Sequence, residues 1–371
     1  MTIKVWSYLE EYETEREEIL AAVDRVFKSG VLILGSSVDN FEKEFAKYCG
    51  ANYGVGVDNA TNGLFLALKS LGIGTGDEVI TVSNTAVPTV SAIVSAGATP
   101  VFVDVEEDTA LLDVNKVEAK LTEKTKCILP VHLFGQCVDI SHLKEVIKGK
   151  KISIVEDCSQ AHGARHNNEL AGSMGDAGVF SFYPTKPLGA YGDGGVVLTN
   201  SEEVDKKLRR LRFYGMSGQY YADEHGYNSR LDEVQAEILR VKLRKIDAYI
   251  SARQSLATRY IEILSDTSLK MLSVGKNNTH IYYVFVVRHP DRDMIIRELK
   301  NKDIFVNISY PWPIHTMKGY SYLGWKDGDL PVTEKLSKEI FSLPMYPCLT
   351  IEQQNAVCSA LSEILGEKID L

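Results

Sequence analysis

Residues 79–103, VITVSNTAVPTVSAIVSAGATPVFV, form an uncharged stretch that decides between two fold classes. The stretch is long enough to raise the question of a membrane span. However, Asn84, Pro88, Gly97 and Pro100 divide it into short pieces. We therefore predict a buried strand over 79–82, a short buried helix from after Pro88 to Gly97, and a second buried strand over 101–105. This pattern indicates a strand–helix–strand unit of an α/β protein.

The same alternation recurs through the first two thirds of the chain. Strand-like segments are YGVGV (53–57), EVITV (78–82), PVFVDV (100–105), KCILPVH (126–132) and KISIVED (151–157). Helical segments between them include NGLFLALKSLG (62–72) and ISHLKEVIKG (140–149). Strands that alternate with helices predict a mostly parallel sheet sandwiched by helices, in which ligands bind at the carboxyl ends of the strands.

Length and composition favour two domains. The 371 residues, 44% of them hydrophobic, can bury one large core and a smaller one. The pattern changes near Ile246, after which we expect a strand over 279–289, a helix over 291–302, a strand over 305–309 and a last helix over 350–365. We predict a large domain over residues 1–245 and a smaller C-terminal α/β domain over 246–371; the N-terminal segment can also pack on the smaller one.

Charge and cysteine usage exclude several classes. A net charge of −9 opposes binding to nucleic acid, which requires a clustered basic surface. The six cysteines are scattered without a C-x-x-C pair, as in a reducing compartment, and the acidic N-terminus does not resemble a signal peptide. We therefore expect a cytoplasmic protein with no membrane or nucleic-acid partner.

Small polar residues, DNATNG at 58–63, follow the first strand-like segment and open a helix. The free backbone N–H groups and the positive dipole end of a helix N-terminus suit a phosphate. Asn and Thr are also common as ordinary helix caps, so both interpretations stay open at this segment.

Asp157 ends the segment KISIVED, where it should face the ligand crevice with little solvent around it. A buried carboxylate in that place needs a cationic partner, unless it caps the next helix. His162 and His166 have an i, i+4 spacing that could suggest a metal site with Asp157. However, Gly163 lies between them and no further ligand cluster follows, so we expect no metal.

Lys186 lies in SFYPTKPLGAYGDGGVV (181–197), which is too irregular to be a helix. A free lysine is almost wholly protonated at neutral pH, so a reactive one must be desolvated or held as an imine. Pyridoxal phosphate accounts for all three segments. It needs a helix N-terminus for its phosphate, a carboxylate for its ring nitrogen and a lysine for its aldehyde.

These stretches closely resemble the nucleotide-sugar aminotransferases of the DegT/DnrJ/EryC1/StrS family, which are fold type I enzymes dependent on pyridoxal 5'-phosphate. The resemblance covers nearly the whole chain. Its motifs are FKSGVLILGSSVDNFEKEFAKYCGA (27–51), VDNATNGLFLAL (57–68), PVHLFGQ (130–136), VEDCSQAHGA (155–164), FSFYPTKPLGAYGDGG (180–195), GYNSRLDEVQAEIL (226–239) and LPVTEKLSKEIFSLPMYPCLT (330–350).

The resemblance implies a role for each matching residue. Lys186 would hold the cofactor as a Schiff base, Asp157 would pair with the pyridinium nitrogen, and Gln160 would contact the side of the ring hydroxyl. The phosphate would be held by Ser181, by the amides around Ala60 and Thr61, and by Asn228 from the neighbouring subunit of an obligate homodimer. Taken alone, Asn228 also looks like the N-cap of an amphipathic helix that contains Leu231, Val234, Ile238 and Val241.

One position departs from the family pattern. Ala86 stands where many relatives have an aromatic residue stacked on the cofactor ring, so the stacking partner is open. Some relatives carry a histidine in place of the lysine and act as sugar dehydratases, and Lys186 therefore favours transamination.

The segments at 213–236 and 308–320 look most like enzymes that aminate C-3 of dTDP-3-oxo-6-deoxyhexoses with L-glutamate as the amino donor. Enzymes that act at C-4 are the nearest alternative. A non-catalytic regulatory relative is a third reading. Candidate substrate contacts are Tyr183, Tyr310 and His315, although interdomain packing would equally explain Tyr310, Trp312 and His315.

Overall fold

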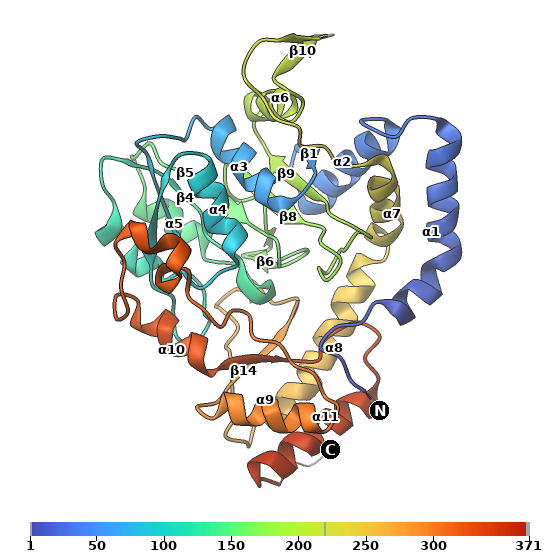
Figure 1. Ribbon diagram of the computed structural model, residues 1–371, viewed down its shortest axis with the longest axis vertical. Coiled ribbons are helices and arrows are strands. Elements are labelled where there is room, and N and C mark those ends of the chain that lie inside the picture. The colour runs from blue at the N-terminus through green and yellow to red at the C-terminus, as the bar shows by residue number, and fades with distance from the viewer. Residues whose placement is uncertain (1, 219, 369–371) are drawn as a thin grey trace.

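A seven-stranded sheet forms the centre of the computed structural model, which describes residues 2–218 and 220–368 (Figure 1). The strand order is β1-β9-β8-β5-β4-β2-β3. Strands β2, β3, β4, β5 and β8 pair in parallel, while β9 runs antiparallel to both β8 and β1. The predicted mostly parallel sheet is confirmed. The bounds of its strands are β1 Tyr53–Val57, β2 Glu78–Val82, β3 Thr99–Val103, β4 Thr125–Ile128, β5 Ser153–Asp157, β8 Ala177–Ser181 and β9 Gly195–Thr199.

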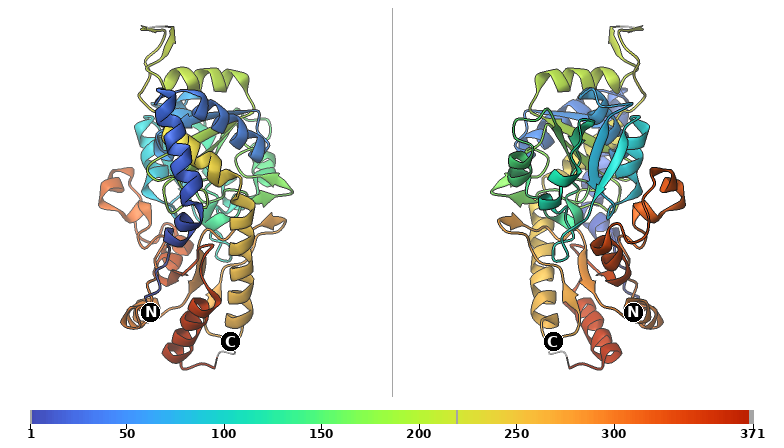
Figure 2. Two further views of the ribbon diagram at one scale, coloured as in Figure 1. Left: turned by 90° about the vertical axis from the view of Figure 1, so that its right-hand side faces the viewer. Right: turned by 90° about the vertical axis from the view of Figure 1, so that its left-hand side faces the viewer.

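Helices lie on either side of this sheet (Figure 2). Their bounds are α1 Leu9–Ser29, α2 Ser36–Cys49, α3 Ala60–Ser70, α4 Val87–Ser95, α5 Ile140–Val146, α6 Glu202–Leu211 and α7 Glu233–Leu243. Because helices cover it, nearly every residue of the inner strands is buried, which explains why these strands are mostly apolar. The stretch 79–103 is therefore a strand, a helix and a strand, as predicted. None of the described helices has the length and apolar character that crossing a membrane requires.

A second hydrophobic core lies beside the first and is built mostly from the C-terminal third of the chain. It contains side chains of α8 (Ile246–Leu264), β14 (Phe285–Arg288), α9 (Arg292–Asn301), β15 (Ile340–Leu343) and α11 (Ile351–Leu365). Ile3 also packs in this core and pairs with Ile304. The boundary at residue 246 stays a prediction, because Ile246 and Ile250 of α8 still pack in the first core.

Two predicted strands of the C-terminal part are wrong or shortened. Residues 305–309 form no strand: Asn307 makes a single bridge with Ser342, and β15 takes the place beside β14. The predicted strand over 279–289 is reduced to β14, with the two-residue strand β13 (Asn278–Thr279) before it. The reason is that Ile281 and Tyr283 donate their amides to the 134–135 turn of the large sheet's periphery instead. The shorter elements are β6 Arg165–His166, β7 Glu169–Leu170, β10 Met216–Gly218, β11 Tyr221–Ala222, β12 Lys270–Met271 and α10 Pro331–Glu339.

A buried carboxylate joins the N-terminal helices to α7. Glu233 is 2% exposed and accepts the amides of Gly35, Ser37 and Val38 at distances of 2.8, 2.8 and 2.9 Å. These amides belong to the N-terminus of α2, whose dipole favours a negative charge. Glu233 therefore serves as a cap supplied from a distant part of the chain.

We expect Glu233→Gln to lower the free energy of unfolding by about 2 kcal/mol or more. The substitution removes the negative charge, and the NH₂ group of glutamine would face backbone amides that are themselves donors. Urea unfolding followed by circular dichroism measures this. The matched control is Glu202→Gln on α6, since that carboxylate is exposed and forms its ion pair with Lys206. Equal unfolding midpoints for the two variants would contradict the capping role.

Candidate active site

A cavity of about 510 Å³ lies at the carboxyl ends of the parallel strands, where the sequence predicted a ligand site. It is lined by all the predicted site residues except Asn228 and His315, namely Ala60, Thr61, Asp157, Gln160, Ser181, Tyr183, Lys186 and Tyr310. The segment 84–89 supplies further lining residues, including Thr85, Ala86 and Thr89. Segments far apart in sequence therefore meet at one site.

The N-terminus of α3 points backbone donors at this cavity. Asn59 is its N-cap and accepts the amide of Asn62 at 2.9 Å. No described residue accepts the amides of Ala60 and Thr61. A Cβ on Gly195 would lie 2.8 Å from the carbonyl carbon of Asn59, so only glycine allows β9 to pass this close. The ordinary cap is thus present at α3, and the amides of Ala60 and Thr61 beside it have the arrangement that an anion site requires.

Asp157 ends β5 and is 4% exposed. Its Oδ2 accepts the Thr89 hydroxyl at 2.8 Å, and its Oδ1 accepts the Ser159 amide at 3.1 Å. Among the described residues it forms no ion pair. A nearly buried carboxylate with only neutral donors leaves room for a cation from a ligand.

Lys186 lies in the connection between β8 and β9, with its amide bonded to the Tyr183 carbonyl at 2.9 Å. Its Nζ sits 4.8 Å from the centre of the Tyr283 ring. Within the described part of the chain no carboxylate pairs with it, so the amine is held in the cavity without a charge partner.

Gln160 and Tyr310 join the two halves of the cavity wall. Gln160 accepts the Phe134 amide at 2.8 Å through Oε1 and donates to the Tyr310 hydroxyl at 2.9 Å through Nε2. Burial raises the pKa of Tyr310 well above its usual value, so its hydroxyl stays protonated. Tyr183 is 52% exposed and belongs to the rim of the cavity.

His315 does not reach the cavity, so the predicted substrate contact finds no support in the geometry. The ring is 1% exposed, and its Nδ1 lies 2.7 Å from Ser83 Oγ while its Nε2 lies 3.1 Å from Glu334. Its physical role is to fasten the segment after Tyr310 to the end of β2. These contacts agree with the packing alternative for His315.

Asn228 is exposed and forms a single bridge with Phe213, away from the cavity of its own chain. Its interpretation as an N-cap is wrong, because α7 begins at Glu233 with Asp232 as the N-cap residue. Ala86 does line the cavity, and it precedes α4 directly. That position therefore provides no ring for stacking.

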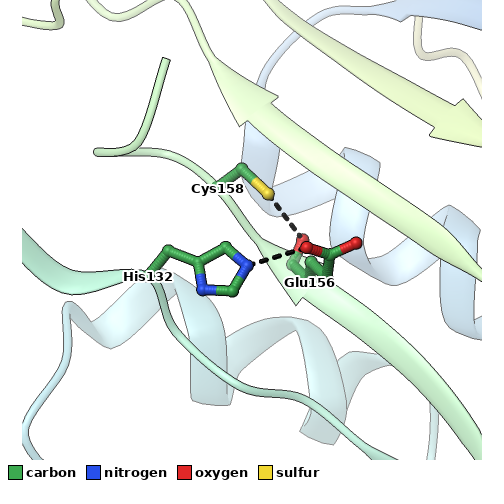
Figure 3. A group of neighbouring side chains, drawn as sticks. All are labelled: His132, Glu156 and Cys158. Carbon is green, nitrogen blue, oxygen red and sulfur yellow. Dashed lines mark hydrogen bonds and ion pairs between the residues drawn. The ribbon is translucent and has the colours of Figure 1, made fainter. Parts of the chain in front are cut away.

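Glu156, which the sequence analysis missed, lies behind the cavity in a buried group with His132 and Cys158 (Figure 3). Its Oε1 accepts the amides of Met174 and Gly175, and its Oε2 accepts the Gly172 amide and His132 Nε2. His132 Nδ1 accepts the Val138 amide, which places the ring proton on Nε2. The carboxylate and imidazole acceptors are thus already occupied, and the group fastens the loop before β8 rather than presenting free metal ligands.

Thr85 and Thr89 are further site residues that the sequence analysis did not single out. The helix that carries Thr89 follows a strand, and two threonines one turn apart at its start were the available signal. They were hidden within an otherwise apolar run.

The polar groups of the cavity that lack a partner among the described residues are chemically complementary to pyridoxal phosphate. Two amides without an acceptor suit its phosphate, a carboxylate without a cation suits its ring nitrogen, and an amine without a carboxylate suits its aldehyde. The residues present therefore fit the cofactor that the sequence implied.

Comparison with known proteins gives consistent matches over the full length. The model of the DegT/DnrJ/EryC1/StrS aminotransferase family matches residues 13–362. A dTDP-3-amino-3,4,6-trideoxy-alpha-D-glucose transaminase of Micromonospora megalomicea subsp. nigra is 57% identical, covering 98% of this chain and 99% of the relative. A pleiotropic regulatory protein of Geobacillus stearothermophilus is 40% identical, covering 98% of each chain. The X-ray structure of S. venezuelae DesV in complex with a ketimine intermediate has a TM-score of 0.96 and 38% identity, covering 100% of both chains.

His162 contacts Ser181: the ring Nε2 of His162 lies 3.0 Å from the carbonyl oxygen of Ser181. Burial, with a contribution from the charge of Lys186, lowers the pKa of His162 to about 3, and burial also lowers the pKa of His280 to about 3. In the unfolded chain both rings titrate near their ordinary pKa of about 6.5. The unfolded state therefore binds more protons between these values, and the stability that the neutral rings contribute is lost as the pH falls.

We expect the free energy of unfolding to decrease from pH 7 to pH 5, with each ring contributing up to about 1.4 kcal/mol per pH unit below its unfolded pKa. His162→Gln should make this slope shallower by about that amount. Urea titrations at several pH values measure the slope, and His142→Gln on the exposed surface of α5 is the control. A slope for His162→Gln identical to that of the unmodified protein would refute the assignment.

Proposed function

The chain belongs to the DegT/DnrJ/EryC1/StrS aminotransferase family, and we propose that it transfers the amino group of L-glutamate to C-3 of a dTDP-linked 3-oxo-6-deoxyhexose. Enzymes of this family use pyridoxal 5'-phosphate, and solved neighbours include its pyridoxal and pyridoxamine forms. The observation that carries the proposal is the convergence of Lys186, Asp157 and the free amides of α3 on one cavity.

Each group of the cofactor has a partner in the cavity. The amides of Ala60 and Thr61 and the hydroxyl of Ser181 would hold the phosphate, and Asp157 would hold the ring nitrogen. Gln160 would lie on the side of the ring hydroxyl, and Lys186 would bind the aldehyde carbon. When bound, the cofactor supplies an electron sink that stabilises negative charge on the reacting carbon of the substrate.

Lys186 is the proton carrier of the reaction. Its Nζ removes the proton from the α-carbon of L-glutamate and, in the second half of the cycle, delivers a proton to C-3 of the sugar. Within the described residues no carboxylate pairs with Lys186 Nζ, so the amine is free to reach the substrate carbon from its place 4.8 Å from the centre of the Tyr283 ring. Asp157 would hold the N–H of the ring nitrogen, since its only donors among the described residues are the neutral Thr89 hydroxyl and Ser159 amide.

Names of similar proteins support C-3 as the site of amination. The Micromonospora relative is named for a 3-amino sugar, and its sugar also lacks the C-4 hydroxyl. The segments at 213–236 and 308–320 pointed to the same position; residue 219 of the first lies outside the described residues. Two forms of the 3-oxo sugar should therefore be tested as substrates, one with the C-4 hydroxyl and one without it. The 4-oxo sugar tests the alternative of amination at C-4.

We expect turnover with L-glutamate and a dTDP-3-oxo sugar, and little with a dTDP-4-oxo-6-deoxyhexose. Lys186→Ala should lower kcat by about a thousandfold or more, because proton transfer by a positioned group contributes about 10² to 10⁴ and cofactor attachment is lost as well. Product formation is followed by chromatography of the amino sugar nucleotide.

The control for this experiment is Lys276→Ala, which removes a lysine outside the cavity. Turnover of the 4-oxo sugar alone would show that amination occurs at C-4 and would refute the proposal of C-3. Turnover by Lys186→Ala at the unmodified rate would refute the mechanism. A protein that binds the cofactor but turns over none of these sugars would favour the regulatory alternative.

We also propose that the protein acts as a homodimer in the cytoplasm. Exposed apolar side chains gather at the end of α1 and just after it, including Phe27 at 62%, Leu32 at 51% and Ile33 at 42% exposure. Such a patch marks a protein interface. Asn228 is exposed and outside its own cavity, which agrees with a phosphate contact in the partner's site. The six cysteines are unpaired, which supports a reducing compartment.

Leu32→Asp combined with Ile33→Asp should convert the dimer to a monomer and weaken cofactor binding, because charges would be buried in the interface and Asn228 would no longer reach the partner. Sedimentation velocity measures the mass, and the visible absorption of the bound cofactor measures its retention. Ile351→Asp is the control, since this side chain is 60% exposed on α11. A monomeric unmodified protein with full activity would refute the shared site.

A further inference from the structure

Two buried threonine hydroxyls lead to the Asp157 carboxylate. Thr85 Oγ1 lies 2.9 Å from Thr89 Oγ1, and Thr89 Oγ1 lies 2.8 Å from Asp157 Oδ2. Thr85 and Thr89 are 2% and 1% exposed. Thr89 is the only described side chain that hydrogen-bonds this carboxylate. The other titratable groups that line the cavity, Tyr183, Lys186, Asp193 and Tyr310, form no hydrogen bond with it.

The direction of these hydrogen bonds follows from proton counting. An ionised carboxylate only accepts, and a hydroxyl has one proton to donate. Thr89 therefore donates its proton to Asp157 and accepts the proton of Thr85. The chain of donors runs one way, from the connection after β2 through the first turn of α4 to the end of β5.

Both oxygens of Asp157 are thus oriented by neutral donors from different elements. Thr89 holds Oδ2 and the Ser159 amide holds Oδ1. A carboxylate that already accepts two hydrogen bonds has lower proton affinity than an isolated buried one. It can attract a cationic N–H strongly without taking its proton.

We propose that Thr89 is a positioning residue that aims the Asp157 carboxylate and keeps the proton on the ring nitrogen of the cofactor, with Thr85 orienting the Thr89 hydroxyl. This inference rests on the proposed function. It adds to Asp157 a second residue, Thr89, on which the electron-withdrawing state of the cofactor ring depends. Loss of the Thr89 hydroxyl raises the proton affinity of Asp157 and frees its orientation. The ring proton then moves toward the carboxylate.

The experiment compares Thr89→Val with Thr89→Ser in the holoenzyme, since valine keeps the shape and serine keeps the hydroxyl. The primary readout is the ¹⁵N chemical shift of the ring nitrogen in labelled pyridoxal phosphate. In Thr89→Val this signal should move toward the unprotonated value, cofactor Kd should rise by about tenfold and kcat should fall by about tenfold or more, since hydrogen bonds to charged groups are the stronger class. The sugar KM should stay nearly unchanged. Thr89→Ser should restore all of these values.

Two further variants complete the design. Thr85→Val should give the same changes at smaller size, because it removes only the donor to Thr89. Thr199→Val, on β9, is the matched control for loss of a buried threonine hydroxyl that bonds the Asp176 carbonyl outside the cavity, and its ring-nitrogen signal should equal that of the unmodified protein.

The proposal is overturned if Thr89→Val leaves the ring-nitrogen signal and the cofactor Kd unchanged. It is also overturned if Thr89→Ser changes the ring-nitrogen signal, the cofactor Kd and kcat as much as Thr89→Val does. Wild-type behaviour of Thr85→Val would remove Thr85 from the proposal. Failure of the proposed function is a separate outcome: the unmodified holoenzyme would then turn over no keto sugar, while its ring-nitrogen signal would still report on Thr89.

Discussion

Two adjacent carboxylates at the end of β5, Glu156 and Asp157, face opposite sides of the sheet because side chains alternate along a strand. Both are nearly inaccessible to water, yet their environments are unequal. Glu156 accepts three backbone amides and the His132 ring, so its oxygens are fully hydrogen-bonded within the protein. Asp157 receives only two neutral donors and faces the cavity. The cavity therefore selects a ligand with a cationic N–H group.

The fully hydrogen-bonded carboxylate of Glu156 also helps to determine where Lys186 lies. By binding the amides of Gly172, Met174 and Gly175, Glu156 fixes the loop that leads into β8. The end of β8 then carries Ser181 toward the free amides of α3, and the following turn brings Lys186 into the same cavity. The hydrogen bonds of Glu156 on one side of the sheet thereby help to place Ser181 and Lys186 at the cavity on the other side.

The far wall of the cavity comes from the C-terminal part of the chain. Ser83 after β2 bonds the backbone and ring of His315, and Asp104 after β3 accepts the amides of Val332 and Thr333 at the start of α10. These contacts fasten the segment that carries Tyr310 to the large sheet, although in sequence it lies between α9 and β15 of the second core. Tyr310 can then accept the hydrogen bond of Gln160. The site is thus closed by segments of both cores.

The amino-acid order alone was enough to predict the mostly parallel sheet, a helix that begins after 58–63, and a ligand site at the carboxyl ends of the strands where Asp157 and Lys186 lie, because apolar periodicity, cap preferences and short motifs act over a few neighbouring residues. It could not decide between packing and substrate binding for His315, it gave Asn228 a helix cap that Asp232 provides instead, and it did not single out Glu156 or Thr89. A buried histidine that fastens two segments and a histidine that binds a sugar look alike in sequence, and the strand expected over 305–309 lost its place to β15. These roles depend on which groups meet across long sequence separations, and only the folded chain brings those partners within hydrogen-bonding distance.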